Sequence, residues 1–84
     1  MFLHVDEVTC LTPYRLRVRF DNGITKDVDL SDELHGEVFE PLRDEDFFRR
    51  VVVNTETRTI EWPNGADFAP EFLYELGKEV KQVA

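Results

Sequence analysis

Residues 59–72 carry the feature that most restricts the fold of this 84-residue chain. The stretch holds the only tryptophan, Trp62, which Pro63 follows directly, and Pro70 stands ahead of its last apolar residues. Proline has no backbone N–H, so Pro63 cannot continue a strand ladder, whereas Pro70 suits the first position of a helix. A strand must therefore end and a helix must begin within this stretch, which predicts a mixed α+β chain.

The corner between this strand and this helix is our candidate site, either for binding a partner or for holding the chain in place. Asp67 has two interpretations within it. The carboxylate could act as a general base or touch a substrate, or it could accept backbone N–H groups and fix the turn. We favour the turn, because no second catalytic group lies near it in the sequence. The candidate residues are Trp62, Pro63, Asn64, Gly65, Asp67, Pro70 and Tyr74.

Residues 14–20 form the clearest predicted strand, because their even positions are apolar or aromatic and their odd positions are arginines. The Asn-Gly pair that follows normally suggests a two-residue turn. That turn would put the apolar residues of the two strands on opposite faces, since a slip of one residue reverses every side chain. A three-residue loop with Gly23 in the left-handed conformation keeps them on one face. It predicts the pairs Phe20–Ile24, Leu16–Val28 and Tyr14–Leu30.

The same register predicts how the arginines of this strand are used. Cross-strand pairs of opposite charge are typical of a solvated sheet face, so we favour that interpretation over a nucleic-acid surface. Lys26 falls on the apolar face, where its stem could be buried while the amine reaches past the rim, or where it could blunt a strand edge. The predicted pairs are Arg17–Asp27, Arg15–Asp29 and Arg19–Thr25.

The segments before and after this hairpin are shorter. A first strand over residues 3–10 is expected to be interrupted at Asp6 and Glu7, where the phase of the apolar residues changes. Residues 31–34 should form one helical turn at most, and residues 37–42 an extended connection. Asp44 is a good N-cap for a short helix over residues 45–49.

A second hairpin and a helix complete the predicted fold. Strands over 51–54 and 59–62 should pair Val53 with Ile60 and Val51 with Trp62 through a four-residue loop. The helix that begins at Pro70 is expected to bury a stripe that Phe68 extends backwards, and Gly77 in its interior should weaken it. The expected stripe consists of Phe72, Leu73, Leu76 and Val80.

These elements predict a single α+β domain over residues 1–84. We expect a small antiparallel sheet, made of a three-stranded meander plus the second hairpin, packed against the C-terminal helix, with one or two short helices in the middle. Residues 78–84 are expected to be a frayed tail, helical only in part.

Charge and composition restrict the partners. Eighteen Asp+Glu against ten Lys+Arg give a net charge of -8, which repels a phosphate backbone, so we expect no direct nucleic-acid binding. A basic protein partner fits this charge, although acidity also serves solubility alone. The single cysteine forms no internal disulfide, and no apolar run nears the roughly 20 residues of a membrane span. We therefore expect a cytoplasmic protein without membrane contact.

No pattern for catalysis is present. The two histidines, His4 and His35, have no second histidine or cysteine at a metal-ligand spacing, so we expect neither a metal site nor a cofactor. Cys10 would need a positioned base to act as a nucleophile, and we interpret it as a buried or partly buried strand residue. The chain also lacks a glycine-rich phosphate loop and a Gly-x-Ser-x-Gly motif. We expect it not to be an enzyme.

From residue 5 to about residue 76 the order of these features resembles the bacterial domain of unknown function 2442 (DUF2442) family. The most specific part is Trp-Pro-Asn-Gly-Ala-Asp at 62–67 with Pro70 and Glu71 behind it, and the hairpin around Asp21-Asn22-Gly23 agrees as well. The resemblance implies a small α+β sheet with helices on one side and no established catalytic residues. Many members are encoded beside a small protein, in an arrangement that resembles a toxin and antitoxin pair. The resemblance thus implies that this chain binds and neutralises a neighbouring toxin.

Two hypotheses follow. The first is a protein-binding module, an antitoxin-like partner of a small basic toxin, which would bind through a strand edge or through aromatic residues between Trp62 and the last helix. The alternative is a small-molecule-binding or regulatory domain with a pocket near Trp62 to Asp67. A homodimer through a strand edge is compatible with either.

Overall fold

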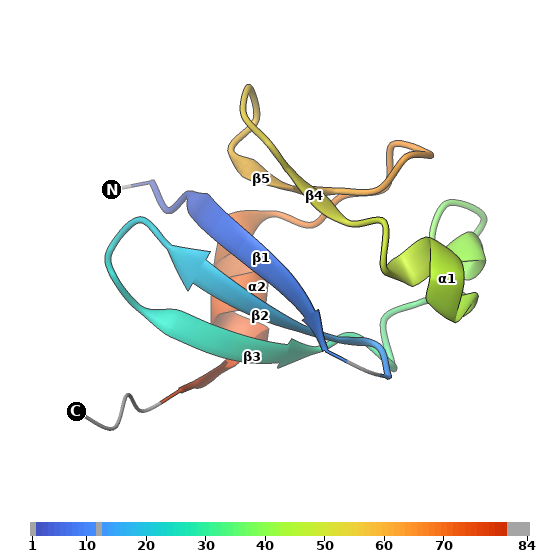
Figure 1. Ribbon diagram of the computed structural model, residues 1–84, viewed down its shortest axis with the longest axis horizontal. Coiled ribbons are helices and arrows are strands. Elements are labelled where there is room, and N and C mark those ends of the chain that lie inside the picture. Colours follow the sequence, from blue (N-terminus) through green and yellow to red (C-terminus); the bar gives the residue numbers. More distant parts are fainter. Residues whose placement is uncertain (1, 12, 81–84) are drawn as a thin grey trace.

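The computed structural model describes residues 2–11 and 13–80 and has two antiparallel sheets and three short helical segments (Figure 1). The larger sheet has the order β1 (Val5–Leu11), β2 (Arg15–Phe20), β3 (Thr25–Asp29) and β6 (Lys78–Glu79). The smaller sheet pairs β4 (Val52–Asn54) with β5 (Thr59–Glu61). The helical segments are the 3-10 helix η1 (Glu40–Arg43), α1 (Glu45–Phe48) and α2 (Pro70–Leu76). The predicted α+β class is confirmed.

The β2–β3 hairpin has the predicted register. Phe20 N–H donates to the carbonyl of Ile24 at 2.9 Å, and Gly23 adopts φ 86°, which only glycine does without strain. Arg17 lies opposite Asp27, and its guanidinium makes two bonds to that carboxylate, at 2.8 and 3.1 Å. The alternation therefore places the apolar residues of both strands in the core and, with the exception of Lys26, the charged residues on the outer face.

Strand β1 joins the two sheets and is irregular where predicted. Its register against β2 shifts between Val5 and Glu7, which confirms the interruption at Asp6 and Glu7. Val5 is buried, and its N–H donates to the carbonyl of Arg58, in the turn of the second hairpin, at 2.8 Å. Beyond the shift, Val5 still lies opposite Phe20 of β2, so this end of β1 contacts both the meander and the second hairpin.

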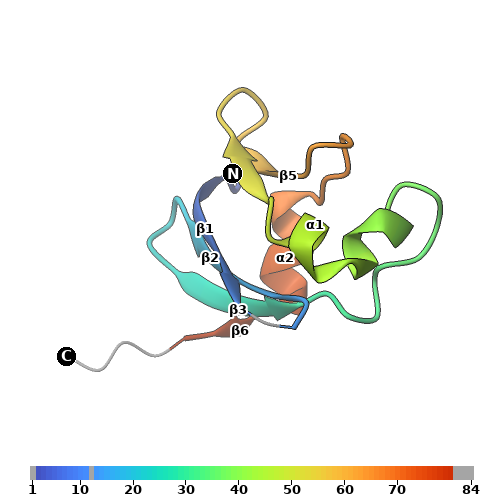
Figure 2. The ribbon, with the colours of Figure 1, turned by 45° about the vertical axis from the view of Figure 1, so that its right-hand side comes forward.

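Residues 78–80 correct the expectation of a frayed, partly helical tail. Lys78 and Glu79 form β6, which pairs with β3, and the N–H of Val80 donates to the carbonyl of Thr25 at 2.9 Å (Figure 2). The helix ends at Leu76 because Gly77 is extended, with φ -75° and ψ 158°. The meander therefore gains a fourth strand; residues 81–84 lie outside the described residues.

Lys26 connects β3 to the end of α2. Its amine donates to the carbonyl of Tyr74 at 2.6 Å and lies 3.6 Å from the centre of the Tyr74 ring. The last carbonyls of a helix have no partner within the helix, and a cation is favourable there. Lys26 thus caps α2, and the expectation that it blunts a strand edge is wrong, because β3 lies between β2 and β6.

The face of α2 that meets the sheet differs from the predicted stripe. It consists of Pro70, Leu73, Tyr74 and Gly77, which follow helical spacing, and Leu73 is fully buried. The Tyr74 ring packs edge-on against Phe20 at a centroid distance of 5.0 Å. The apolar pattern missed this face because proline and glycine occupy two of its positions. The other predicted stripe residues of the helix, Phe72 and Leu76, are both exposed, and Val80 lies beyond the helix.

The middle segment is more compact than predicted. Residues 37–42 were expected to be extended, but they turn and enter η1, with the N–H groups of Phe39 and Glu40 both bonded to the carbonyl of Gly36. Gly36 has φ 92°, which permits the turn, and Pro41 stands at the start of η1. Asp44 caps α1 as predicted, since its carboxylate accepts the N–H of Asp46 at 2.9 Å.

Replacing Gly77 by alanine should destabilise the protein. A Cβ at this position would lie 2.9 Å from Cβ of Lys26 and 3.0 Å from Cγ2 of Val28, both held by strand β3. At an extended position without a clash, replacing glycine by alanine slightly raises the free energy of unfolding, because alanine has less conformational freedom in the unfolded chain. The close contacts at Gly77 turn this gain into a loss. We expect a loss of about 1–3 kcal/mol in the free energy of unfolding by urea denaturation. Glu75→Ala, on the exposed side of the same helix, is the control; a Gly77→Ala protein as stable as wild type would contradict the close approach.

The Arg17–Asp27 pair should contribute to stability in a pH-dependent way. The hydrogen bond from Arg17 lowers the pKa of Asp27 below the ordinary value of about 3.9. The folded protein then binds fewer protons than the unfolded chain, so the contribution is present above about pH 4 and is lost as the pH falls through the lowered pKa. The difference in unfolding free energy between wild type and Asp27→Asn should therefore shrink below about pH 4. The control is Asp32→Asn, which removes no ion pair among the described residues. If the difference in unfolding free energy between wild type and Asp27→Asn stayed constant with pH, the ion pair would not be the source of the stability.

Candidate functional site

The second hairpin leads into the corner with the predicted register. Val53 pairs with Ile60 as predicted, and the ladder ends at Val52 and Glu61, so the predicted pair Val51–Trp62 lies just beyond it. Beyond β5, the N–H of Trp62 donates to the carbonyl of Ala66 at 2.9 Å, which closes a tight loop. The chain therefore reverses over residues 63–65 and runs back beside β5.

Trp62 lies in the core. It is 1% exposed, and its indole Nε1–H donates to the carbonyl of Phe48, at the end of α1, at 2.9 Å. Its ring packs against Phe48 and Phe68, with centroid distances of 5.7 and 6.0 Å. A buried tryptophan with a satisfied N–H is a structural residue, so Trp62 itself does not face a partner.

Asn64, and not Asp67, holds the turn. The side-chain oxygen of Asn64 accepts the N–H of Ala66 at 3.1 Å, and its amide donates to the carbonyl of Val38 at 2.9 Å. Asp67 is exposed, and within residues 2–11 and 13–80 its side chain makes no hydrogen bond or ion pair. The interpretation of Asp67 as the residue that fixes the turn is wrong, because Asn64 reaches both the turn and a distant segment.

The remaining candidate residues divide between the inside and the surface. Pro70 begins α2 as predicted, and Tyr74 lies against the sheet beside Lys26. Pro63 and Gly65 are exposed, and Gly65 has φ 86°. The corner is therefore built as a structural unit, with its large aromatic residues turned inward.

A row of phenylalanines stands on this unit, and the sequence pattern did not reveal it. The ring of Phe68 stacks on Phe39 at 4.8 Å with an interplanar angle of 26°, and on Phe72 at 5.5 Å with an angle of 11°. We call these three residues the aromatic row. The predicted helix stripe already joined Phe68 to Phe72, which are four residues apart, but Phe39 comes from a distant segment and was not included.

The corner holds the aromatic row in place. The hydroxyl of Thr59 donates to the carbonyl of Phe68 at 2.6 Å, and the edge of the Phe68 ring meets Trp62. The bond from Asn64 to Val38 ties down the residue before Phe39. The buried corner thus positions the middle ring of the row and one of its ends.

The row is only partly covered, and carboxylates adjoin it. Phe72 is 37% exposed, whereas Phe39 and Phe68 are partly buried. Each ring has an exposed acid as a sequence neighbour, and Glu75 follows Glu71 after one turn of α2. In the described part of the chain none of these acids forms an ion pair. The acids next to the row are Glu40, Asp67 and Glu71.

Other groups with chemical potential lie outside the corner. His4 contacts Asp21 at 2.9 Å, and this hydrogen bond lowers the pKa of Asp21. Cys10 is partly buried, and burial raises the pKa of its thiol, which disfavours the reactive thiolate. Among the residues that the structure describes, no three His, Cys, Asp or Glu side chains gather where a metal ion could bind. His35 is exposed.

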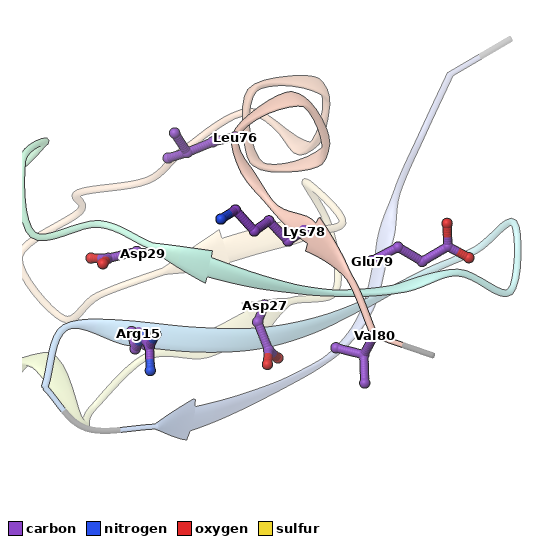
Figure 3. Close-up of a pocket in the computed structure, with 7 residues that line it drawn as sticks. All are labelled: Arg15, Asp27, Asp29, Leu76, Lys78, Glu79 and Val80. Carbon is purple, nitrogen blue, oxygen red and sulfur yellow. The ribbon is translucent and has the colours of Figure 1, made fainter. Parts of the chain in front are cut away.

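A hollow of about 360 Å³ lies at the other end of α2, beside β6 and β3, and β2 contributes Arg15 to its lining (Figure 3). Its walls carry both signs of charge, and it shares no residue with the corner. The lining residues are Arg15, Asp27, Asp29, Leu76, Lys78, Glu79 and Val80.

The family model described as Protein of unknown function (DUF2442) matches residues 5–79, so the chain belongs to this family. No curated protein and no solved structure gives a significant match to the chain. Within the described ranges, the helices are too short or too polar to cross a membrane.

Alanine substitutions at Asn64 and Asp67 should separate their roles. Asn64→Ala removes two hydrogen bonds and should lower the free energy of unfolding by about 1–2 kcal/mol. Asp67→Ala removes no side-chain hydrogen bond among the described residues, so its free energy of unfolding should stay within about 0.5 kcal/mol of wild type. Thermal or urea denaturation of the two variants measures the difference. A larger loss for Asp67→Ala than for Asn64→Ala would restore Asp67 as the residue that fixes the turn.

Proposed function

We propose that this protein is a non-catalytic protein-binding module of the cytoplasm, and that it acts as the antitoxin-like partner of a small basic protein encoded beside it. The observation that supports this most is the partly exposed aromatic row next to acids that have no ion-pair partner among the described residues. Apolar surface that gathers in one place and is rimmed by polar groups is typical of protein interaction sites. Aromatic residues are also enriched among those that dominate binding energy.

Charge favours a basic partner. The net charge of -8 attracts cationic proteins over a distance and accelerates their association, particularly at low salt. The same charge opposes direct contact with nucleic acid. The acids at the row add a local attraction where the apolar contact would form, so steering and docking would act on the same surface.

The alternative, a small-molecule pocket near Trp62 to Asp67, has less support. Trp62 and Ala66 fill the inside of the corner, and both are buried. The hollow shown in Figure 3 lies at the far end of α2, among other residues, and shares none of them with the corner.

Co-expression with the product of the adjacent gene tests the proposal. A tagged form of the protein should co-purify with that product at low salt, and the complex should weaken as salt rises, because the attraction is partly electrostatic. Where the product inhibits growth, co-expression should relieve the inhibition. An unrelated small basic protein serves as the control for non-specific attraction.

The outcomes separate the parts of the proposal. A complex without any effect on growth would leave the binding role and overturn the antitoxin role. The absence of a complex, with growth inhibition unrelieved, would overturn both.

A further inference from the structure

We propose that the partner element bound by this protein is an amphipathic basic helix, and that it docks on the outward face of α2 together with the aromatic row. The inference rests on the proposed function in that it takes the ligand to be a protein. It adds the surface that is used and the kind of segment that fits it.

The outward face of α2 carries two parallel lines of side chains. Phe72 and Leu76 are one turn apart and are 37% and 38% exposed. Glu71 and Glu75 are also one turn apart, and both are exposed. Residues four apart on a helix are neighbours on its surface, so an apolar line runs beside an acidic line. A partner with an apolar stripe and a cationic stripe would match both lines.

The aromatic row widens the apolar line beyond α2. Phe68 stacks on Phe72 in nearly parallel orientation, and Phe39 stacks on the other side of Phe68. The hydroxyl of Thr59 bonds to the carbonyl of Phe68, and the ring of Trp62 packs against the ring of Phe68. The rings of the row are therefore ordered before a partner binds. Preorganised rings lose little conformational entropy on binding, which favours affinity.

The backbone at this surface favours a helix over an extended peptide. Extended peptides gain affinity by adding a strand to a sheet edge, with main-chain hydrogen bonds. Phe39 precedes η1, Phe68 follows Asp67, which makes a single bridge to Glu61 of β5, and Phe72 lies on α2. None of the three phenylalanines therefore lies on a strand among the described residues. A helix satisfies its own backbone groups and binds through side chains alone, which is what this surface offers.

The unpaired acids define the charge of the helix. Glu40, Asp67, Glu71 and Glu75 form no ion pair with any described residue, so lysines or arginines of a partner would meet them without breaking existing pairs. An acidic helix would be repelled. We therefore expect the partner helix to be basic, and an amphipathic helix of the opposite charge should not bind.

A synthetic helix tests the surface directly. The probe is a peptide of leucine and lysine of about 18 residues, long enough to form a helix, with leucines at i, i+3, i+4 and i+7. Two controls are a scrambled peptide of the same composition without an apolar face and a peptide with glutamate in place of lysine. Titration followed by amide NMR should show saturable shifts over residues 37–40 and 67–76 for the basic amphipathic peptide only. Equal binding of the scrambled peptide, or shifts centred elsewhere, would overturn the inference.

Variants with matched controls separate the apolar and charged contributions. Phe72→Ala should weaken binding of the peptide at least about tenfold, whereas Val52→Ala, at an apolar residue of β4 that is 56% exposed, should not. The double change Glu71→Lys and Glu75→Lys should weaken binding and flatten its salt dependence. Asp32→Lys with Glu56→Lys makes the same change in net charge at exposed turn residues and should have a smaller effect. Circular dichroism confirms that each variant is folded.

The same variants, assayed with the adjacent gene product, distinguish failure of this inference from failure of the proposed function. A complex with that product that Phe72→Ala leaves unchanged would overturn the docking surface and leave the function. If the peptide binds at the outward face of α2 but no complex with the product forms, the proposed function is overturned and the docking surface remains. If neither binds, both are wrong.

Discussion

The burial of one indole ring organises the second half of this protein. Trp62 ends the second hairpin, donates its N–H to the end of α1 at 2.9 Å, and supports the ring of Phe68 ahead of α2. A domain of this size has few large side chains to bury, so each contributes a substantial share of the core. Without the indole, the hairpin, α1 and the start of α2 would lose the group that they share.

This arrangement separates the structural corner from the surface that we propose as functional. The unusual residues of the corner hold the chain: Asn64 secures the turn and the segment before Phe39, and Thr59 secures Phe68. The rings that reach the surface are ordinary phenylalanines. The distinctive sequence therefore lies beneath the proposed contact surface and determines its shape.

The sequence predicted best where side chains alternate. The apolar residues at even positions of β2 decided between two loop lengths, and Val53 opposite Ile60 decided the second hairpin, because a slip of one residue would expose the core. Pro70 correctly predicted where helix α2 begins. The buried face of the helix was not predicted, because Tyr74 and Gly77 do not belong to an apolar stripe in the sequence.

Features that depend on distant contacts were not predictable. Strand β6 exists because glycine at position 77 lets the chain approach β3, which no local pattern shows. Asn64 reaches Val38, 26 residues away, whereas Asp67 was judged only by its neighbours in the sequence. The aromatic row was missed for the same reason: Phe39 joins Phe68 only in the folded protein.

In our proposal, Trp62 supports the docking surface from within and does not belong to it. Acrylamide quenching of the fluorescence of this single tryptophan tests it in the free protein, in the unfolded protein and with the basic amphipathic peptide bound. We predict weak quenching in the folded protein, strong quenching after unfolding, and no change when the peptide binds. Strong quenching in the free folded protein, with protection on binding, would show instead that the tryptophan is exposed and contacts the peptide.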